Sequence, residues 1–582
     1  MSDTQRDSAQ PSLTDPGSDD GGSRGIQVFS APSDAPRVRW RTDLISAGFT
    51  TALLAVLILI AGNGSTLDTN TLTFIGTLPG WLLWLGQAAY LIGVLYAFGL
   101  VIGVGFVARK RKELLRDMLL AAVLAVGGVL ALTWRIDSRW PEFAFFDLDE
   151  TRETFPAFFI TTSTAIQAAA SPHLTAPMRK IGWGFILTAV AASVLGGVTT
   201  VSDALGGLLV GLISAALIRY VFGTSAGLPS TNRIREGLAD LGVDVTDLTY
   251  WPEQPESSVV LTATSSDGTP LFVDGLGRDS WSTRRWTRMW KQAWYTDQGS
   301  QYGSDRRQQI EHEGLAMLLA GHGGAPVPEL VTVGMTDRGD ALLVSSLFDK
   351  LLSDVAADAV DDDLLDSIWD ALDKLHDGGI SHGSLDSVHI WFDASGAPEL
   401  MGFGDAVIHP TADQLHQDVA SLLVVTALIV GEQRAIAAAR RAKTDGELTA
   451  MLPLMQTAAL NGRLRHRVKK QKLKVKDLRK QAAAAIGVDV PAPLQLTRVT
   501  WKSVVMGAFV LFAVYTIMGG LAEVGFDTIV ETLSDARWSL VILGLVLAAA
   551  TNYTDSIAVA SVSPKPVPIG ITTVEQLSLI HI

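Results

Sequence analysis

The sequence predicts a mostly α-helical membrane protein with about eight transmembrane helices and an inserted cytosolic α+β domain of two lobes. Two observations lead to this fold class. Of the 582 residues, 48% are hydrophobic and only 18% are charged, a composition that favours membrane spans. Apolar runs of spanning length occur in two blocks, residues 44–222 and 502–560, and the stretch between them lacks such runs.

Charge and cysteine content exclude several classes of function. The formal net charge of -14 argues against a nucleic-acid-binding protein, because neutralising phosphates requires a basic surface. The chain has no cysteine, so it has no disulfide, no thiolate nucleophile and no cysteine-ligated metal site. We expect neither a cofactor nor a bound metal ion.

Residues 1–36 are rich in Ser, Asp, Gly and Pro and poor in large apolar side chains. Such a segment cannot bury enough apolar surface to offset the entropy of ordering, so a disordered tail is predicted. It lacks the basic start and apolar core of a signal peptide, and the first hydrophobic run should insert uncleaved.

Residues 37–225 are predicted to form a six-span membrane bundle. The candidate spans lie at about 44–62, 81–107, 114–134, 155–170, 181–198 and 204–222. Lys and Arg are retained on the cytoplasmic side, and the basic stretches that fall on one side of the predicted spans are 37–41, 109–116 and 178–180. The N-terminus and the segment after the sixth span are therefore expected in the cytoplasm.

Residues 228–460 have the patterning of a soluble α+β domain. The stretch 258–276 alternates like a hairpin around Asp267 and Gly268, and residues 341–347 read as a buried strand. Helical spacing is seen at 305–322 and 361–379.

Within this domain, "HGSLDSVHIWFDASGAPELMGFGDA" at 382–406 resembles the catalytic loop and metal-binding loop of the protein-kinase-like superfamily. The likeness spans roughly residues 232–440, and its matching positions are His382, Gly383, Leu385, Phe403 and Gly404. It implies a two-lobed kinase-like fold.

The residues that perform phosphoryl transfer in that superfamily are missing at the matching positions. An Asp accepts the hydroxyl proton, an Asn and a second Asp hold magnesium, and a Lys grips the phosphates. Those positions, which we call the kinase-like positions, hold Ser384, His389, Gly402 and Asp274. Only Glu313 could be the helix carboxylate that pairs with the Lys.

Asp386 and Asp405 are the nearest substitutes, but each is displaced by two or three residues, and a misplacement of about 1 Å can cost ~100-fold in rate. We expect a pseudokinase in which His382 is a structural histidine bonded to backbone. A kinase with non-standard metal ligands stays open as the alternative.

Residues 461–500 are predicted to form a basic juxtamembrane helix, at 463–480, and a linker. This helix is either a solvated surface or a contact with anionic lipids, to which each Lys or Arg contributes about 1 kcal/mol. The cations expected in that contact are Arg463, Arg467, Lys469, Lys470 and Lys474.

Residues 155–217 resemble the type 2 phosphatidic acid phosphatase family, because Asp203, Gly206 and Gly207 match its Asp-x-x-x-Gly ending. The resemblance places a phosphate-binding or nucleophilic group where this chain has Phe159, Ser193 and Thr199, which we call the phosphatase-like positions. A helix bundle with glycine packing faces at Gly206, Gly207 and Gly211 is therefore expected in place of a phosphatase.

Residues 501–576 hold two more predicted spans, 502–521 and 538–560, joined by an acidic external loop. They resemble the start of the flippase-like transmembrane family of lysylphosphatidylglycerol synthases, which implies movement of a polar or polyprenyl-linked lipid. Residues 577–582, "LSLIHI", resemble translated adapter sequence, and the natural protein is expected to continue beyond Gln576.

Together these resemblances predict a non-enzymatic protein of a bacterial, actinobacterial-like inner membrane. Its expected role is lipid or polyprenyl-lipid transport or its regulation, with the pseudokinase as sensor or scaffold. A membrane-anchored ATP-dependent kinase and a scaffold without transport activity are the two alternatives.

Overall fold

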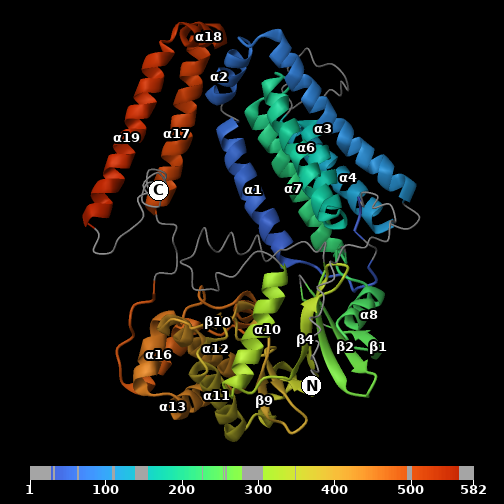
Figure 1. Cartoon of the computed structure of the whole chain (residues 1–582), viewed down its shortest axis with the longest axis vertical. Helices are drawn as coiled ribbons and strands as arrows, with labels where there is room; N and C mark the ends of the chain where they lie inside the picture. Colours follow the sequence, from blue (N-terminus) through green and yellow to red (C-terminus); the bar gives the residue numbers. More distant parts are fainter. Residues whose placement is uncertain are drawn as a thin grey trace, which may run out of the picture.

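A computed structural model of the chain describes residues 28–30, 33–61, 65–107, 112–137, 155–225, 227–252, 254–255, 258–277, 306–347, 349–494 and 501–562. The described part is mostly helical with a small sheet region, which confirms the coarse fold class. A helix bundle lies above an α+β module, and a separate helical hairpin stands beside the bundle (Figure 1). Gln576 and the predicted non-native tail lie outside the described residues.

Seven helices among the described residues are long and apolar enough to cross a membrane, which is consistent with a membrane protein. They coincide with seven of the eight predicted spans. They are α1 (Arg41–Ala61), α3 (Gly80–Val107), α4 (Lys112–Asp137), α6 (Ala176–Leu195), α7 (Val201–Phe222), α17 (Trp501–Val524) and α19 (Trp538–Val562).

The span predicted at 155–170 is wrong, because this segment forms the short helix α5 (Phe158–Ala170) of 13 residues. At 1.5 Å per residue α5 is about 20 Å long, less than the ~30 Å of a bilayer core. From Ile160 to Ala170 every residue except Thr162 is buried, and α5 contacts α3, α4, α6 and α7. Four neighbouring helices thus enclose its Thr, Ser and Gln side chains, which would be costly to expose to lipid.

The predicted close approach at Gly206, Gly207 and Gly211 of α7 is confirmed, and its partner is α5 with the residues just before it. A Cβ atom added to Gly211 would lie 2.6 Å from Thr164 Cβ, and one added to Gly207 would lie 2.9 Å from the Ala157 carbonyl oxygen. At Gly206 it would lie 2.7 Å from the Phe155 ring. These glycines therefore let the α7 backbone approach α5 closely, as small residues do in membrane bundles.

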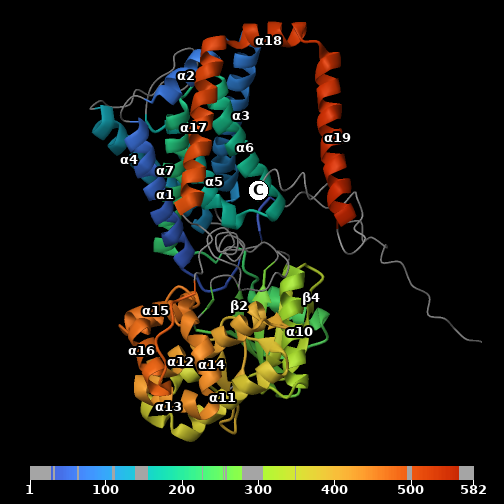
Figure 2. The ribbon, with the colours of Figure 1, turned by 90° about the vertical axis from the view of Figure 1, so that its left-hand side faces the viewer.

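The sequence did not predict two ten-residue helices, α2 (Thr66–Ile75) and α18 (Phe526–Asp535). They connect the C-terminal hairpin to the bundle: Thr66 Oγ1 donates to Tyr515 Oη at 3.1 Å, and the backbone N–H of Phe526 donates to Thr77 Oγ1 at 3.0 Å. Figure 2 shows α18 crossing from α17 to α19 at the end of the bundle far from the module. The expected acidic loop therefore contains a helix.

The sheet lobe of the module, residues 228–346, is a five-stranded antiparallel sheet in the order β1-β2-β3-β5-β4. Its predicted hairpin at Asp267–Gly268, the buried strand and the helix at 305–322 are confirmed. Its elements are α8 (Thr231–Asp240), β1 (Val245–Tyr250), β2 (Val259–Ser265), β3 (Pro270–Leu276), α10 (Arg306–His322), β4 (Leu330–Met335) and β5 (Ala341–Ser346).

Period-two alternation along β3 gives the sheet two buried faces. Leu271 and Val273 pack with α8, whereas Phe272 and Leu276 pack with α10 and with the remainder of the module. The second face is therefore the one that meets the helical lobe.

The helical lobe, residues 349–494, packs around the fully buried Trp369 and confirms the predicted helix at 361–379. Its short strands and 3-10 turns are β6 (Lys350–Leu351), η3 (Leu352–Asp354), η4 (Ala357–Ala359), β7 (Ile380–Ser381), β8 (Ile390–Phe392), β9 (Pro398–Leu400), η5 (Phe403–Asp405), β10 (Val407–Ile408) and η6 (Leu452–Leu454). Its helices are α11 (Asp362–Asp377), α12 (Ala412–Val430), α13 (Glu432–Ala442), α14 (Asp445–Met451), α15 (Gly462–Lys470) and α16 (Val475–Ile486).

The single basic helix predicted at 463–480 is two helices, α15 and α16, separated by a turn in which Lys472 has φ 58°. Leu464 and Val468 on α15, and Leu478 on α16, belong to the main apolar core of the helical lobe. The segment is therefore part of the packed module, because its apolar side chains recur at helical spacing within the run of basic residues.

The end of the predicted disordered tail makes ordered contacts with both parts of the molecule. The Ser30 N–H donates to the His173 carbonyl oxygen at 2.9 Å. The Asp34 carboxylate accepts bonds from the Thr231 N–H at 2.9 Å and from Tyr250 Oη at 2.8 Å. Partial burial raises the pKa of Asp34, but the bonds from Thr231 and Tyr250 outweigh it and hold the pKa below its ordinary value. The Asp34 carboxylate is thus ionised at neutral pH.

Candidate functional site

Three of the kinase-like positions lie together, and one of them fills the space of another. Nδ1 of His389 lies 2.9 Å from the Ser384 carbonyl oxygen, which fixes the imidazole ring over Gly402. A Cβ atom added to Gly402 would lie 2.7 Å from Cδ2 of His389. Gly402 also has φ 86°, a conformation that residues with a Cβ rarely adopt. The position that would carry the metal-binding Asp has no room for a side chain.

The two loops that would flank a metal ion touch each other. A Cβ atom added to Gly383, which has φ 75°, would lie 2.2 Å from the Asp405 carbonyl oxygen. The backbone of 382–389 is therefore pressed against the backbone that follows β9.

The substitute carboxylates differ in their surroundings. Asp386 is buried, its Oδ1 accepts from the Ser387 N–H at 2.7 Å, and Arg467 lies 3.5 Å away. Asp405 is exposed. Within the described ranges, no group of three or more His, Asp or Glu side chains could hold a metal ion.

His382 is a buried structural residue. Its Nε2–H donates to the Met401 carbonyl oxygen at 3.0 Å, and its side chain is fully enclosed. Burial lowers the pKa of His382, although the nearby Asp418 opposes that shift, so the ring is neutral at pH 7. A neutral ring with one N–H committed to the backbone matches the sequence expectation.

Asp418 of α12 holds the 382–389 loop in place, a role that was not predicted from the sequence. Its carboxylate accepts bonds from the backbone N–H groups of His382, at 2.6 Å, and Gly383, at 2.9 Å. His376 Nε2 lies 3.3 Å from the same carboxylate. The sequence signal that could have revealed this role is an Asp within the apolar run of α12, because a charge buried there must be paired.

The fourth kinase-like position, Asp274, and the expected helix carboxylate, Glu313, are both acidic. Asp274 lies on β3 opposite Leu343 of β5, and Glu313 is buried on α10. Two carboxylates cannot form the Lys–Glu ion pair that positions ATP in a kinase. The neighbouring His312 instead holds α10 to the end of η5, with Nε2 donating to the Ala406 carbonyl oxygen at 2.9 Å.

An aromatic pair joins the two lobes next to these positions. The rings of Phe272 and Trp391 meet edge to face with centroids 4.8 Å apart, and the two residues are only 8% and 4% exposed. Phe272 shares its face of β3 with Asp274, and Trp391 follows His389 by two residues on β8. The stack therefore joins β3 of the sheet lobe to β8 of the helical lobe, two residues along the chain from Asp274 and from His389.

Two of the phosphatase-like positions, Ser193 and Thr199, are in direct contact. Thr199 Oγ1 donates to Ser193 Oγ at 2.9 Å, and Ser193 Oγ donates to the Val190 carbonyl oxygen at 2.9 Å. Phe159 packs against the same apolar cluster as Val190 and Val198. The structure joins two of these positions, Ser193 and Thr199, by a hydrogen bond between their hydroxyls, and neither these hydroxyls nor the Phe159 ring is an activated nucleophile.

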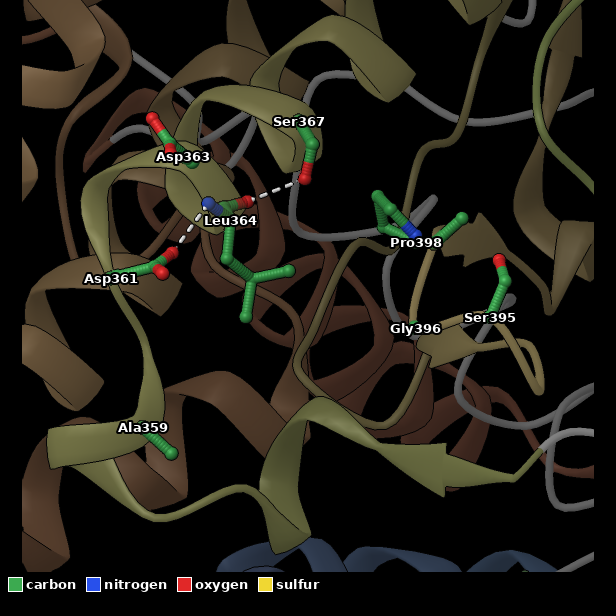
Figure 3. A pocket seen from close by; sticks show the side chains of 9 residues that line it. Ala359, Asp361, Asp363, Leu364, Ser367, Ser395, Gly396 and Pro398 are labelled. Atoms are coloured by element: carbon green, nitrogen blue, oxygen red, sulfur yellow. Dashed lines mark hydrogen bonds between the residues drawn. The ribbon is translucent and has the colours of Figure 1, made fainter.

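A surface hollow of about 480 Å³ lies between the start of α11 and the β8–β9 turn (Figure 3). Two of its polar groups already serve the fold: Asp361 accepts from the Leu364 N–H, and Ser367 donates to the Leu364 carbonyl oxygen. None of its lining residues is a kinase-like or phosphatase-like position. It therefore adds no chemistry to the site.

Comparisons with known proteins add little to this geometry. No family model and no curated protein matches the chain. Among solved structures, the chain is similar to "Structure of vaccinia related kinase 3" with a TM-score of 0.22 and 12% identity, over 44% of this chain and 90% of that one. A likeness at this level carries no argument, so the reading of the module rests on its own contacts.

Proposed function

We propose that this chain is a membrane protein whose α+β module is a kinase-like domain without phosphoryl-transfer chemistry, serving as a sensor or scaffold. One observation carries the proposal: the His389 ring occupies the space that a metal-binding side chain at Gly402 would need. Phosphoryl transfer depends on metal ions that neutralise the developing charge, so loss of that site removes the main catalytic term.

Two further features support the same reading. Asp274 places a carboxylate where a cation should grip phosphate, and like charges repel. The Phe272–Trp391 stack gives the two lobes a direct contact that does not depend on a nucleotide. A domain closed in this way can present a fixed surface to a partner.

The rival function is a kinase that uses Asp386 and Asp405 as metal ligands. Purified full-length protein in lipid nanodiscs is expected to consume no ATP above the empty-nanodisc rate with Mg²⁺ or Mn²⁺, because these carboxylates are not gathered into a metal site. ATP and ADP are likewise expected to leave the melting temperature unchanged.

The Asp386→Asn and Asp405→Asn variants are the matched controls for this measurement. Metal-dependent ATP consumption that either substitution abolishes would establish the kinase and overturn the proposal. Consumption that both variants retain would point to a contaminating enzyme.

We further propose that the process served by this domain is movement of a polar or polyprenyl-linked lipid, or its regulation, in a bacterial inner membrane with the module in the cytoplasm. What supports this is the resemblance of residues 501–576, together with the apolar side chains that α17 and α19 expose along their length. Among these are Phe509, Phe512 and Leu545.

Lipid movement is tested in vesicles that hold the full chain and a fluorescent lipid in both leaflets. Faster loss of dithionite-protected signal than in empty vesicles is expected if the chain moves lipid by itself. A rate equal to that of empty vesicles, with the protein folded, would reject transport and leave the scaffold function.

A further inference from the structure

α15 has two faces with different chemistry, and one of them is an unassigned basic surface. We infer that the outer face of α15, formed by Arg463, His466, Lys469 and Lys470, binds anionic headgroups of the membrane that holds the bundle. This inference deepens the proposed function and rests on the bundle's insertion in a bilayer. It names the partner as lipid and narrows the residues that contact it.

Charge is the first observation. Residues 462–486 contain ten Lys or Arg and a single acid, Asp477, in a chain whose net charge is -14. The four outer-face residues are all exposed. Arg463, His466 and Lys470 recur at intervals of three and four, which puts them on one side of the helix. A compact positive surface thus stands out on an acidic protein.

Position is the second observation. Figure 2 shows α15 at the edge of the helical lobe nearest the helix bundle, whereas α13 lies at the opposite end of the lobe. If the bundle spans a bilayer, α15 lies on the side of the module that faces the headgroups. The tether also raises the local concentration of lipid around this face.

Arg467 lies on the inner side of α15 and is therefore not part of the proposed lipid surface. Arg467 is half-buried and faces the buried Asp386 of the 382–389 loop at 3.5 Å, so its charge is directed at that loop. Asn461, the N-cap of α15, donates through Nδ2 to the Ser384 carbonyl oxygen at 2.8 Å and to the Leu385 carbonyl oxygen at 3.2 Å. The helix that meets the lipid is therefore fastened to the loop that has lost its chemistry.

Lipid fits this face better than the other polyanions. A freely diffusing nucleic acid would have to approach a chain of net charge -14, whereas the headgroups are already held beside α15 by the bundle. Anionic lipids also make the cytoplasmic leaflet negative, which attracts juxtamembrane basic segments. The partner of the outer face of α15 is therefore an anionic lipid surface.

The absence of cysteine makes a clean test possible. Gln471 is exposed at the end of α15, and a Gln471→Cys variant of the full chain can carry one fluorophore. Reconstituted in phosphatidylcholine vesicles with or without 30% phosphatidylglycerol, the label is expected to be quenched by nitroxide lipids only in the anionic vesicles. Quenching should fall as salt rises from about 0.15 M to 1 M, because the screening length shrinks from ~8 Å to ~3 Å.

The decisive variant is Arg463→Gln/Lys469→Gln/Lys470→Gln. Removal of three cations is expected to weaken the contact on the order of 100-fold and bring quenching to the neutral-vesicle level. The matched control, Arg434→Gln/Arg440→Gln/Arg441→Gln on α13, removes the same charge at the far end of the lobe and should quench like the wild type. Equal quenching in neutral and anionic vesicles, or in the α15 triple variant and wild type, overturns the lipid surface.

A second label separates this failure from failure of the proposed function. Ile92 on α3 is 54% exposed in the bundle, and a label on an Ile92→Cys variant should be quenched by nitroxide lipids in both vesicle types. Loss of that signal would mean that α3 is not in the bilayer, which overturns the membrane proposal. If the Ile92→Cys label is quenched but quenching of the Gln471→Cys label does not depend on anionic lipid, only the α15 inference is overturned.

Discussion

Replacement of Gly402 by Asp, which restores the metal-binding residue type, is expected to destabilise the α+β module by about 3 kcal/mol and to create no metal site. A residue with a Cβ at φ 86° costs roughly 1–2 kcal/mol. Overlap with His389, whose Cδ2 would lie 2.7 Å from the new Cβ, adds roughly 1–3 kcal/mol. Urea unfolding of the full chain in detergent, followed by the fluorescence of the module, measures the change.

Combining Gly402→Asp with His389→Ala separates the cost of backbone strain at residue 402 from the cost of overlap with the His389 ring. Removal of the ring should recover the steric part of the loss, on the order of 1–3 kcal/mol, and leave the backbone strain. Gly402→Ala should cost nearly as much as Gly402→Asp, since the clash begins at the Cβ atom. A loss below about 0.5 kcal/mol, or equal losses with and without His389, would contradict this account of the loop.

The sequence located these positions but could not show how they fit together. The distances from His382 to Ser384, His389 and Gly402 follow from a pattern of letters, and they predicted which chemical groups are missing. That the ring of one substituted residue fills the space of another depends on φ at Gly402 and on the bond from His389 to Ser384. Neither has a sequence signature. The sequence therefore predicted which residue types occupy these positions, and the structure shows that His389 lies directly against Gly402.

In the helix bundle and the C-terminal hairpin, the sequence predicted the helices that are long and apolar. α3 and α7 were found because continuous apolar runs are a strong signal. α5 was mistaken for a span because apolar content does not reveal that a helix is enclosed on all sides. α2 and α18 were missed because ten residues fall below spanning length, and their contacts with α17 and Thr77 are tertiary.

The basic segment shows the same limit in a different form. Its charge was obvious, but the buried Leu464 and Val468 that fasten α15 to the lobe were hidden among the cations. Arg467 looked equivalent to its neighbours, and only the fold places it next to Asp386. Counting charges along a chain finds a basic segment, whereas the fold decides which cations are left for a partner.

Removal of the Asp418 carboxylate is expected to destabilise the helical lobe at the loop of residues 382–389. Asp418→Ala leaves the buried N–H group of His382 without its acceptor, at roughly 1–3 kcal/mol, and removes a part-buried bond from the exposed Gly383, at roughly 1 kcal/mol. The summed loss of about 2–4 kcal/mol should loosen the loop that α15 holds from its other side. Hydrogen exchange of full-length protein in nanodiscs reads the loop directly, as loss of amide protection at 382–389.

Asp418→Asn is the matched control, because its amide oxygen can still accept one of the two bonds. It should lose roughly half as much stability and retain partial protection of the loop. Protection of 382–389 that survives Asp418→Ala unchanged would mean that Asn461 and the Met401 contact hold the loop without α12. In that event α15 alone would position the loop of residues 382–389, and a lipid bound at the outer face of α15 would act on a loop that α12 does not hold.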